Sequence, residues 1–191
     1  DDPVWSAVNW PDKPPSADYR VQCNLPGYLP TDSLVAWYPF NGNAIDESGN
    51  GNNGTVNYGG VSGTDRLGNT NSSLVSIAND MDVGCGSDPS LQIKGDLTFS
   101  LWAKPSQFDS SQVLISIAGV GELEQHNYLY YLQWWGNGNL AYFHEYGAGI
   151  DKYEIFNTGL SLGSWHHIAI VRDDAAKTVS CYINGLLNAT N

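Results

Sequence analysis

Positive charge is scarce in this 191-residue chain, which carries 8 Lys and Arg residues against 20 Asp and Glu residues and a formal net charge of -12 at pH 7. That balance repels phosphate backbones and anionic membrane surfaces, so we expect no nucleic-acid partner. No run approaches the roughly 20 apolar residues of a membrane span, so we expect no membrane insertion. The acidity is compatible with a neutral ligand or with bound calcium, and simple solvation of the surface would also explain it.

Cysteine is also rare, with Cys23, Cys85 and Cys181 only. An odd count permits at most one internal disulfide plus a free thiol, and the sequence leaves the pairing open. No two of them have C-x-x-C spacing, which argues against a zinc or redox site. The chain opens Asp1-Asp2-Pro3 without a signal peptide, as a trimmed or mature form would.

No long helical period is present, and methionine occurs once against 21 Gly, 7 Trp, 11 Tyr and 5 Phe. This profile is typical of short aromatic-rich strands joined by polar turns. The clearest alternation places Leu97, Phe99, Leu101 and Ala103 on one strand face. Hairpin turns are indicated at Gly136-Asn137-Gly138-Asn139 and at Asn184-Gly185. We therefore predict an all-β, two-sheet antiparallel β-sandwich, with strands near residues 34–38, 54–56, 73–77, 81–83, 97–103, 113–117, 128–135, 140–146, 165–171, 178–183 and from 186 onward.

Proline divides the chain unevenly, because six of its nine prolines lie in the first 33 residues. Proline lacks a backbone donor and fixes φ, so this segment cannot be a central strand or a helix interior. We expect residues 1–33 to form a Pro-rich arm or linker, and residues 34–191 to form the sandwich.

Five blocks in order carry a family resemblance: residues 34–55, 64–69, the T-x-S-x-W-x-K-P strand within 97–105, 165–169 and 182–185. Together they resemble the laminin-G-like, concanavalin A-like lectin/glucanase jelly rolls of secreted bacterial multidomain proteins of Bacteroidetes type. The resemblance implies a non-catalytic, lectin-like recognition module that is secreted or at the cell surface. Its implied partner is a glycan or another cell-surface ligand.

The resemblance also implies further strands after the Asn184-Gly185 hairpin, one of which would pair with the opening strand at Leu34–Tyr38. The sequence ends before such a block. We therefore expect an incomplete sandwich with an unpaired edge beside Leu34, and chains that self-associate by pairing or swapping across it.

A calcium site is suggested by the loop over residues 41–53, where oxygen-bearing side chains alternate with glycines. The resemblance implies a structural calcium there, with Asp46 as the main ligand and Asn41, Asn43 and Ser48 as further donors. The alternative is an Asx-rich turn whose side chains cap their own backbone.

A ligand site is suggested by aromatic and polar residues on the two strands around the Gly136–Asn139 turn. Aromatic rings stack on sugar rings, and Gln, His and Asp side chains bind hydroxyl groups. We predict a carbohydrate site made by Tyr131, Gln133, Trp135, Tyr142 and His144, with Asp151 from the following loop. The alternative is that these residues only fill the core.

Two other function classes remain in view. One is a protein-adhesion or structural domain without a sugar site. The other is a glycoside hydrolase, for which Glu122 and Glu124 are the nearest match to the paired carboxylates that such enzymes need. His166 and His167 are adjacent in a strand and face opposite sides, so they cannot share one metal ion. We expect one of them in the core and the other on the surface.

Overall fold

The computed structural model describes residues 33–77, 81–108, 112–118, 128–145 and 151–191. Described residues up to Leu91 form one compact unit, and those from Gln92 to Asn191 form another. Residues 1–32 of the predicted arm lie outside the described residues, so the arm stays a prediction. Among the described residues, no helix has the length and apolar character needed to cross a bilayer.

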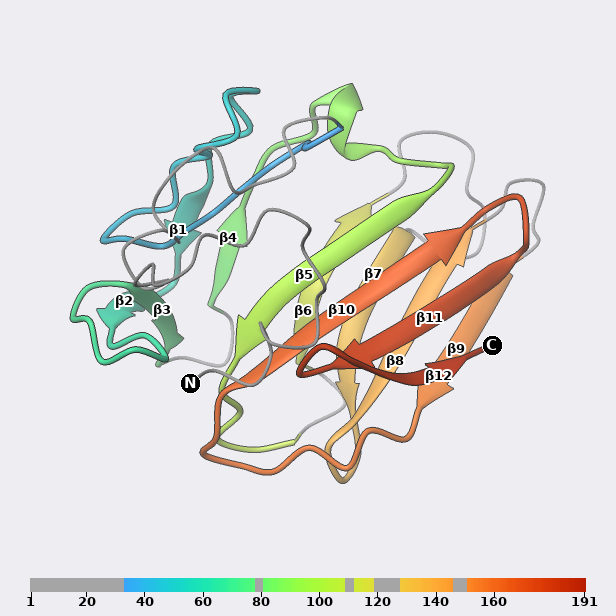
Figure 1. Ribbon diagram of the computed structural model, residues 1–191. Coiled ribbons are helices and arrows are strands. Elements are labelled where there is room, and N and C mark those ends of the chain that lie inside the picture. Colours follow the sequence, from blue (N-terminus) through green and yellow to red (C-terminus); the bar gives the residue numbers. More distant parts are fainter. Residues whose placement is uncertain (1–32, 78–80, 109–111, 119–127, 146–150) are drawn as a thin grey trace, which may run out of the picture. The chain divides into compact units, whose positions relative to one another are not determined.

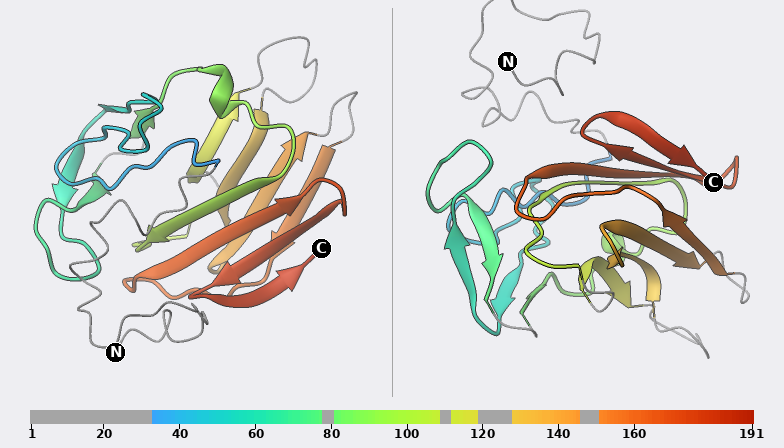
Figure 2. Two further views of the ribbon diagram at one scale, coloured as in Figure 1. Left: turned by 45° about the horizontal axis from the view of Figure 1, so that its top comes forward. Right: turned by 90° about the horizontal axis from the view of Figure 1, so that it is seen from below.

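The larger unit is a sandwich of two four-stranded antiparallel sheets. Figure 1 shows the sheets as two layers, and the right-hand view of Figure 2 shows them nearly end-on. One sheet has the order β12-β11-β10-β5 and the other β6-β7-β8-β9. This confirms the predicted all-β sandwich. The strands are β5 (Leu97–Ala103), β6 (Val113–Ala118), β7 (Tyr128–Trp135), β8 (Asn139–Glu145), β9 (Asp151–Phe156), β10 (His166–Asp173), β11 (Thr178–Ile183) and β12 (Leu186–Thr190).

The core of the larger unit follows from period-two alternation. Buried and half-buried side chains alternate along most of β10, with Ile168 and Ile170 inside. Phe99 of β5 contacts rings of the other sheet, at centroid distances of 5.2 Å to Tyr130 and 6.2 Å to Tyr142. Such cross-layer aromatic contacts hold the two sheets together. The prediction that Leu97, Phe99, Leu101 and Ala103 share one face is confirmed, and that face points inward, because all four pack in this core.

Two predicted hairpins are confirmed. Gly136, Asn137 and Gly138 join β7 to β8, and Asn184 and Gly185 join β11 to β12, all with positive φ. At Gly138 a Cβ atom would collide with the backbone oxygen of Leu160. Only glycine fits there, because the Leu160 amide also donates to the Gly138 carbonyl over 3.2 Å.

The smaller unit contains two two-stranded antiparallel sheets. Strand β1 (Thr55–Asn57) pairs with β4 (Asp82–Gly84), and β2 (Gly60–Gly63) pairs with β3 (Ser73–Ser76). A short 3₁₀ turn, η2, covers Pro89–Leu91.

The predicted strand at Leu34–Tyr38 is wrong, because these residues are not part of a strand. Their backbone groups instead bond to the loop over residues 41–53. The Asn50 side chain donates to the carbonyl oxygens of Leu34 and Val35 over 2.6 and 3.1 Å, and the Glu47 amide donates to that of Trp37 over 2.9 Å. The Asn50 side chain and the Glu47 backbone amide thus take the place of the strand partner that this apolar run predicted. Self-association across this edge stays a prediction.

Two strands were not predicted. Strand β2 begins and ends with glycine, which has a low strand propensity. In β9 the charged residues Asp151, Lys152 and Glu154 hid the alternation, so Asp151 was assigned to a loop, whereas it begins this strand.

Candidate functional site

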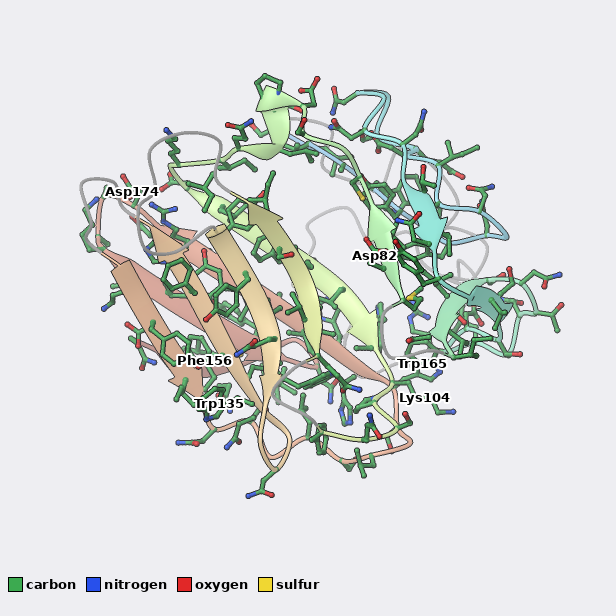
Figure 3. The ribbon with its side chains drawn as sticks, turned by 180° about the vertical axis from the view of Figure 1, so that it is seen from behind. Asp82, Lys104, Trp135, Phe156, Trp165 and Asp174 are labelled. Carbon is green, nitrogen blue, oxygen red and sulfur yellow. The ribbon has the colours of Figure 1, made fainter. Side chains whose placement is uncertain are left out.

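The β6-β7-β8-β9 sheet has one face against the core and one face outward. In β7, Leu132 and Trp134 point inward, whereas Tyr131 and Gln133 are half-buried and Trp135 is 38% exposed. Figure 3 looks at this sheet from behind, with Trp135 near the turn between β7 and β8. The cross-strand register decides which neighbours share the outward face.

The register pairs Tyr131 with Phe143 of β8, and Phe143 in turn with Tyr153 of β9. Tyr131 and Phe143 stack at a centroid distance of 5.1 Å and an interplanar angle of 12°. Trp135 meets Tyr153 edge-on at 5.9 Å. We call Tyr131, Gln133, Trp135, Phe143 and Tyr153 the aromatic face; Trp135 and Tyr153 are its exposed rings, and Phe143 is buried.

The polar groups of the aromatic face are few and neutral. Burial raises the pKa of Tyr153, and a hydrogen bond with the Gln133 side chain offsets part of that rise. The hydrogen bond between the Gln133 and Tyr153 side chains therefore fixes both of them beside the exposed Trp135. Glu145 and Asp151, which the register also places on this side of the sheet, have side chains outside the described residues. The described side chains that the register places here are uncharged; they include Val113, Ser116, Tyr131, Gln133, Trp135, Asn139, Ala141, Phe143, Tyr153 and Ile155.

The structure brings together only half of the predicted ligand residues. Tyr131, Gln133 and Trp135 lie on the aromatic face, but Tyr142 and His144 are fully buried on the opposite, inward face. The register places Leu132 opposite Tyr142, so the predicted grouping of all five residues on one face is not formed. The side chain of Asp151 lies outside the described residues.

Phe143 and Tyr153 belong to the aromatic face and were missed. Both follow from the register once β9 is recognised as a strand. The sequence signal for them is the alternation of Tyr153 and Ile155 with the charged residues of β9.

His144 sits inside the sandwich in an environment that opposes its charge. Burial lowers its pKa to about 4, and the positive charges of Arg172 and Lys152 add to the effect. Arg172 is itself buried and donates to the Lys94 carbonyl over 2.7 Å and to Asp174 over 2.9 Å. His144 is thus a neutral group of the core at pH 7, not a surface ligand for hydroxyl groups.

The predicted calcium loop is organised around Asp46, which is 6% exposed. Its Oδ1 accepts from the amides of Trp37 and Ser48, and its Oδ2 from the Ser48 hydroxyl and the Asn52 amide, all at 2.9–3.0 Å. Burial acts to raise the pKa of this carboxyl, but these hydrogen bonds outweigh it and hold the pKa below its ordinary value. Each carboxylate oxygen already accepts two hydrogen bonds from the protein. A calcium ion binds through oxygen lone pairs, and these are occupied here. This arrangement therefore does not fit Asp46 as a calcium ligand.

The other predicted calcium donors are also engaged within the loop. Asn43 accepts from the Ile45 amide over 2.8 Å, Asn41 donates to Glu47 over 2.9 Å, and the Ser48 hydroxyl bonds to Asp46. These contacts match the Asx-turn alternative. Within the described ranges, no three His, Cys, Asp or Glu side chains form a group that could hold a metal ion. The described contacts therefore do not bring the predicted ligands together as a calcium site, and they do not test calcium binding itself.

The enzyme alternative rests on residues that the structure does not describe, because Glu122 and Glu124 lie outside the described residues. The prediction for the two histidines is confirmed: His166 is buried and bonds to the Ser161 carbonyl over 2.9 Å, whereas His167 is half-buried and bonds to Ser100 over 2.9 Å. His167 also contacts Trp102 at a ring distance of 5.3 Å on the outward face of the other sheet.

Comparison with known proteins agrees with this architecture. A laminin-G family model, described as the concanavalin A-like lectin/glucanases superfamily, matches residues 69–191. No curated protein matches the chain. The match runs from β3 through β12 and includes both sheets of the sandwich. The chain therefore belongs to the concanavalin A-like lectin/glucanases superfamily.

Proposed function

We propose that the protein is a non-catalytic, carbohydrate-binding recognition module, and that the aromatic face holds a neutral glycan. The observation that carries the proposal is the exposed edge-to-face pair of Trp135 and Tyr153, with Gln133 beside it. An aromatic pair exposed to water on a sheet face is unusual, because such rings normally lie in the core.

The chemistry of the aromatic face matches that of a sugar. The C–H faces of a pyranose ring pack against aromatic rings, and the Gln133 amide can both donate to and accept from hydroxyl groups. Tyr131 and Trp135 are four residues apart on β7, which corresponds to about 13 Å along a strand. A row of that length suits several sugar rings of an extended chain better than a single ring.

No Lys or Arg is among the residues of β6 to β9 that the register places on the outward face, and a sulfated or uronic glycan would need such partners. This favours a neutral glycan. The net charge of -12 also repels anionic glycans, and so it too favours a neutral one. Two carboxylates facing the glycan would be needed for hydrolysis. The five residues of the aromatic face include no carboxylate, and Glu145 and Asp151, which the register places on the same side of the sheet, lie at the opposite end of β8 and β9 from Trp135.

Affinity electrophoresis in gels containing neutral polysaccharides, or sulfated ones for comparison, tests the proposal. We expect neutral polysaccharide to retard the protein, and Trp135→Ala or Tyr153→Ala to weaken retardation at least tenfold, since stacked aromatic side chains commonly dominate such contacts. Trp102→Ala is the matched control, because it removes a tryptophan from the outward face of the other sheet. Equal retardation of Trp135→Ala and wild type would overturn the proposal.

The second candidate is an adhesion domain that binds protein. The exposed Val113 and Ile155 on the same face favour it, because apolar residues also serve protein interfaces. Both candidates suit a secreted or cell-surface protein, which we propose as its location. The second candidate would be selected if neither sulfated nor neutral glycans bind and a protein ligand shields Trp135 from solvent.

A further inference from the structure

The three cysteines of the chain allow three different intramolecular disulfides, and the structure distinguishes between them. Cys85 lies in the smaller unit and Cys181 in the larger one, and both are free thiols in the structure. Cys23 lies outside the described residues. The surroundings of Cys85 and Cys181 therefore decide which pair can form.

Cys181 is enclosed in the core of the larger unit. It is fully buried in β11, and the register places it between Ile170 of β10 and Ala189 of β12. The buried side chains described in this core include no other cysteine. A disulfide needs two Cβ atoms about 4 Å apart, so a partner would have to enter the core and displace packed side chains. Burial also raises the pKa of the Cys181 thiol to about 12, which leaves almost no reactive thiolate.

Cys85 has the opposite surroundings. It directly follows β4 and is half-buried, and the next residues, Gly86 and Ser87, are exposed. Its thiol donates a weak hydrogen bond of 3.6 Å to the Val83 carbonyl, and the loss of that contact would cost little. Cys85 can therefore meet a second thiol without any change in the core.

The chain that leads from Cys23 is long enough to reach Cys85. The Asn52 side chain donates to the Val35 carbonyl over 3.0 Å and to the Ser90 hydroxyl over 3.2 Å, so Val35 and Ser90 are close neighbours within the smaller unit. Along the chain, Cys85 lies no more than about 18 Å from Ser90. The stretch from Cys23 to Val35 can span about 40 Å when it is extended. The two sulfur atoms can therefore meet, and their common tether favours this pairing over a bond between two molecules.

We propose that Cys23 and Cys85 form a disulfide bond in an oxidising compartment, and that Cys181 stays a free, buried thiol. The two thiols lose two protons and two electrons, and a disulfide oxidant such as glutathione disulfide takes them up and leaves as two glutathione thiols. The bond ties the predicted arm to the smaller unit and closes a loop of about 60 residues, which restricts the unfolded chain. It does not depend on glycan binding, because none of the three cysteines belongs to the aromatic face.

The test equilibrates the full chain in a glutathione redox buffer, unfolds it, blocks the free thiols and maps the disulfides by mass spectrometry after tryptic digestion without reductant. Trypsin places the three cysteines in separate peptides, which cover residues 21–66, 67–94 and 178–191. We expect the first two peptides to be joined and the third to carry the blocking group. If the blocking reagent is added before unfolding, Cys181 should not react, because it is fully buried.

Melting temperatures give a second measurement. Reductant should lower the melting temperature of wild type by at least about 5 °C, because the loop constraint is lost. Cys23→Ser and Cys85→Ser should not respond to reductant. Cys181→Ala is the matched control, since it removes the cysteine outside the bond and should keep both the joined peptides and the response to reductant.

Three results would overturn the proposal. One is a joined peptide that contains Cys181, and another is three blocked thiols after equilibration in the oxidising buffer. The third is a dimer on non-reducing gels that is linked through Cys85, which would show that the thiol meets another molecule before it meets Cys23.

Discussion

The buried His144 makes the stability of the sandwich depend on pH. Its folded-state pKa of about 4 lies below the value of about 6.5 expected in the unfolded chain. The unfolded state therefore takes up a proton first as pH falls, and stability that is complete above pH 6.5 is lost toward pH 4. We expect the free energy of unfolding to fall by about 2 kcal/mol between pH 7 and pH 5, measured by urea titration.

The control is His144→Gln, a neutral variant at every pH. The quantity to compare is the change in the free energy of unfolding between pH 7 and pH 5, not its value at one pH. We expect this change to be much smaller in the variant than in wild type. An unchanged pH dependence in His144→Gln would show that another group carries it.

The Asp46 carboxylate organises its loop by accepting four hydrogen bonds, three from backbone amides and one from the Ser48 hydroxyl. Asp46→Asn places an amide NH₂ against some of these donors. We expect a loss of about 1–3 kcal/mol in the free energy of unfolding. Asn41→Asp is the comparison, since Asn41 is exposed and makes only a surface contact with Glu47.

The same geometry predicts the response to calcium. If Asp46 is saturated by protein donors, neither excess calcium nor a chelator should shift the melting temperature of wild type. A rise of several degrees with calcium would contradict this expectation and show that the folded protein binds the metal.

At the scale of elements, the turn between β7 and β8 sets the composition of the aromatic face. Three residues, Gly136 to Gly138, separate the strands, so odd positions of β7 face odd positions of β8. Alternation along one strand can be read from the sequence, and it correctly places Gln133 and Trp134 on opposite faces of β7. Which residues of the next strand share a face with them cannot be read in this way, because changing the loop length by one residue moves that strand's side chains to the other face. This is why Tyr142 was assigned to the site in place of Phe143.

The turn itself can be tested. Gly138→Ala puts a Cβ atom against the Leu160 backbone at a φ of 78°. We expect it to cost about 3 kcal/mol in the free energy of unfolding, from strain and collision together. Gly136→Ala, with open space around its Cβ, should cost about 1 kcal/mol. Equal costs in thermal or urea unfolding would argue against the close approach of Leu160.

Strand β9 shows a second limit of prediction from sequence. Its charged residues Lys152 and Glu154 form an ion pair at 2.7 Å on the inward side, while Tyr153 and Ile155 point outward. Inward-facing charge on an edge strand is a known protection against edge-to-edge pairing. It reverses the usual apolar-inside pattern, so the strand was overlooked and Asp151 was placed in a loop. The strands with ordinary alternation, such as β5 and β11, were predicted within a residue.

At the scale of the whole molecule, the proposed glycan site lies within the larger unit. The outward face of its β6-β7-β8-β9 sheet carries the aromatic face, whose row of rings suits a glycan chain. Membership in the superfamily fixes the sandwich but not the ligand, since function depends on the site and not on the fold. The case for a glycan therefore rests on Trp135, Tyr153 and Gln133.

The most direct test is NMR observation of the Trp135 indole N–H during titration with neutral oligosaccharides, with the resonance assigned through Trp135→Phe. The account predicts that this signal and the amides around Tyr153 and Gln133 shift together and saturate, while the Trp102 indole does not move. Saturating shifts confined to other tryptophans, or no shift with any neutral oligosaccharide, would contradict it.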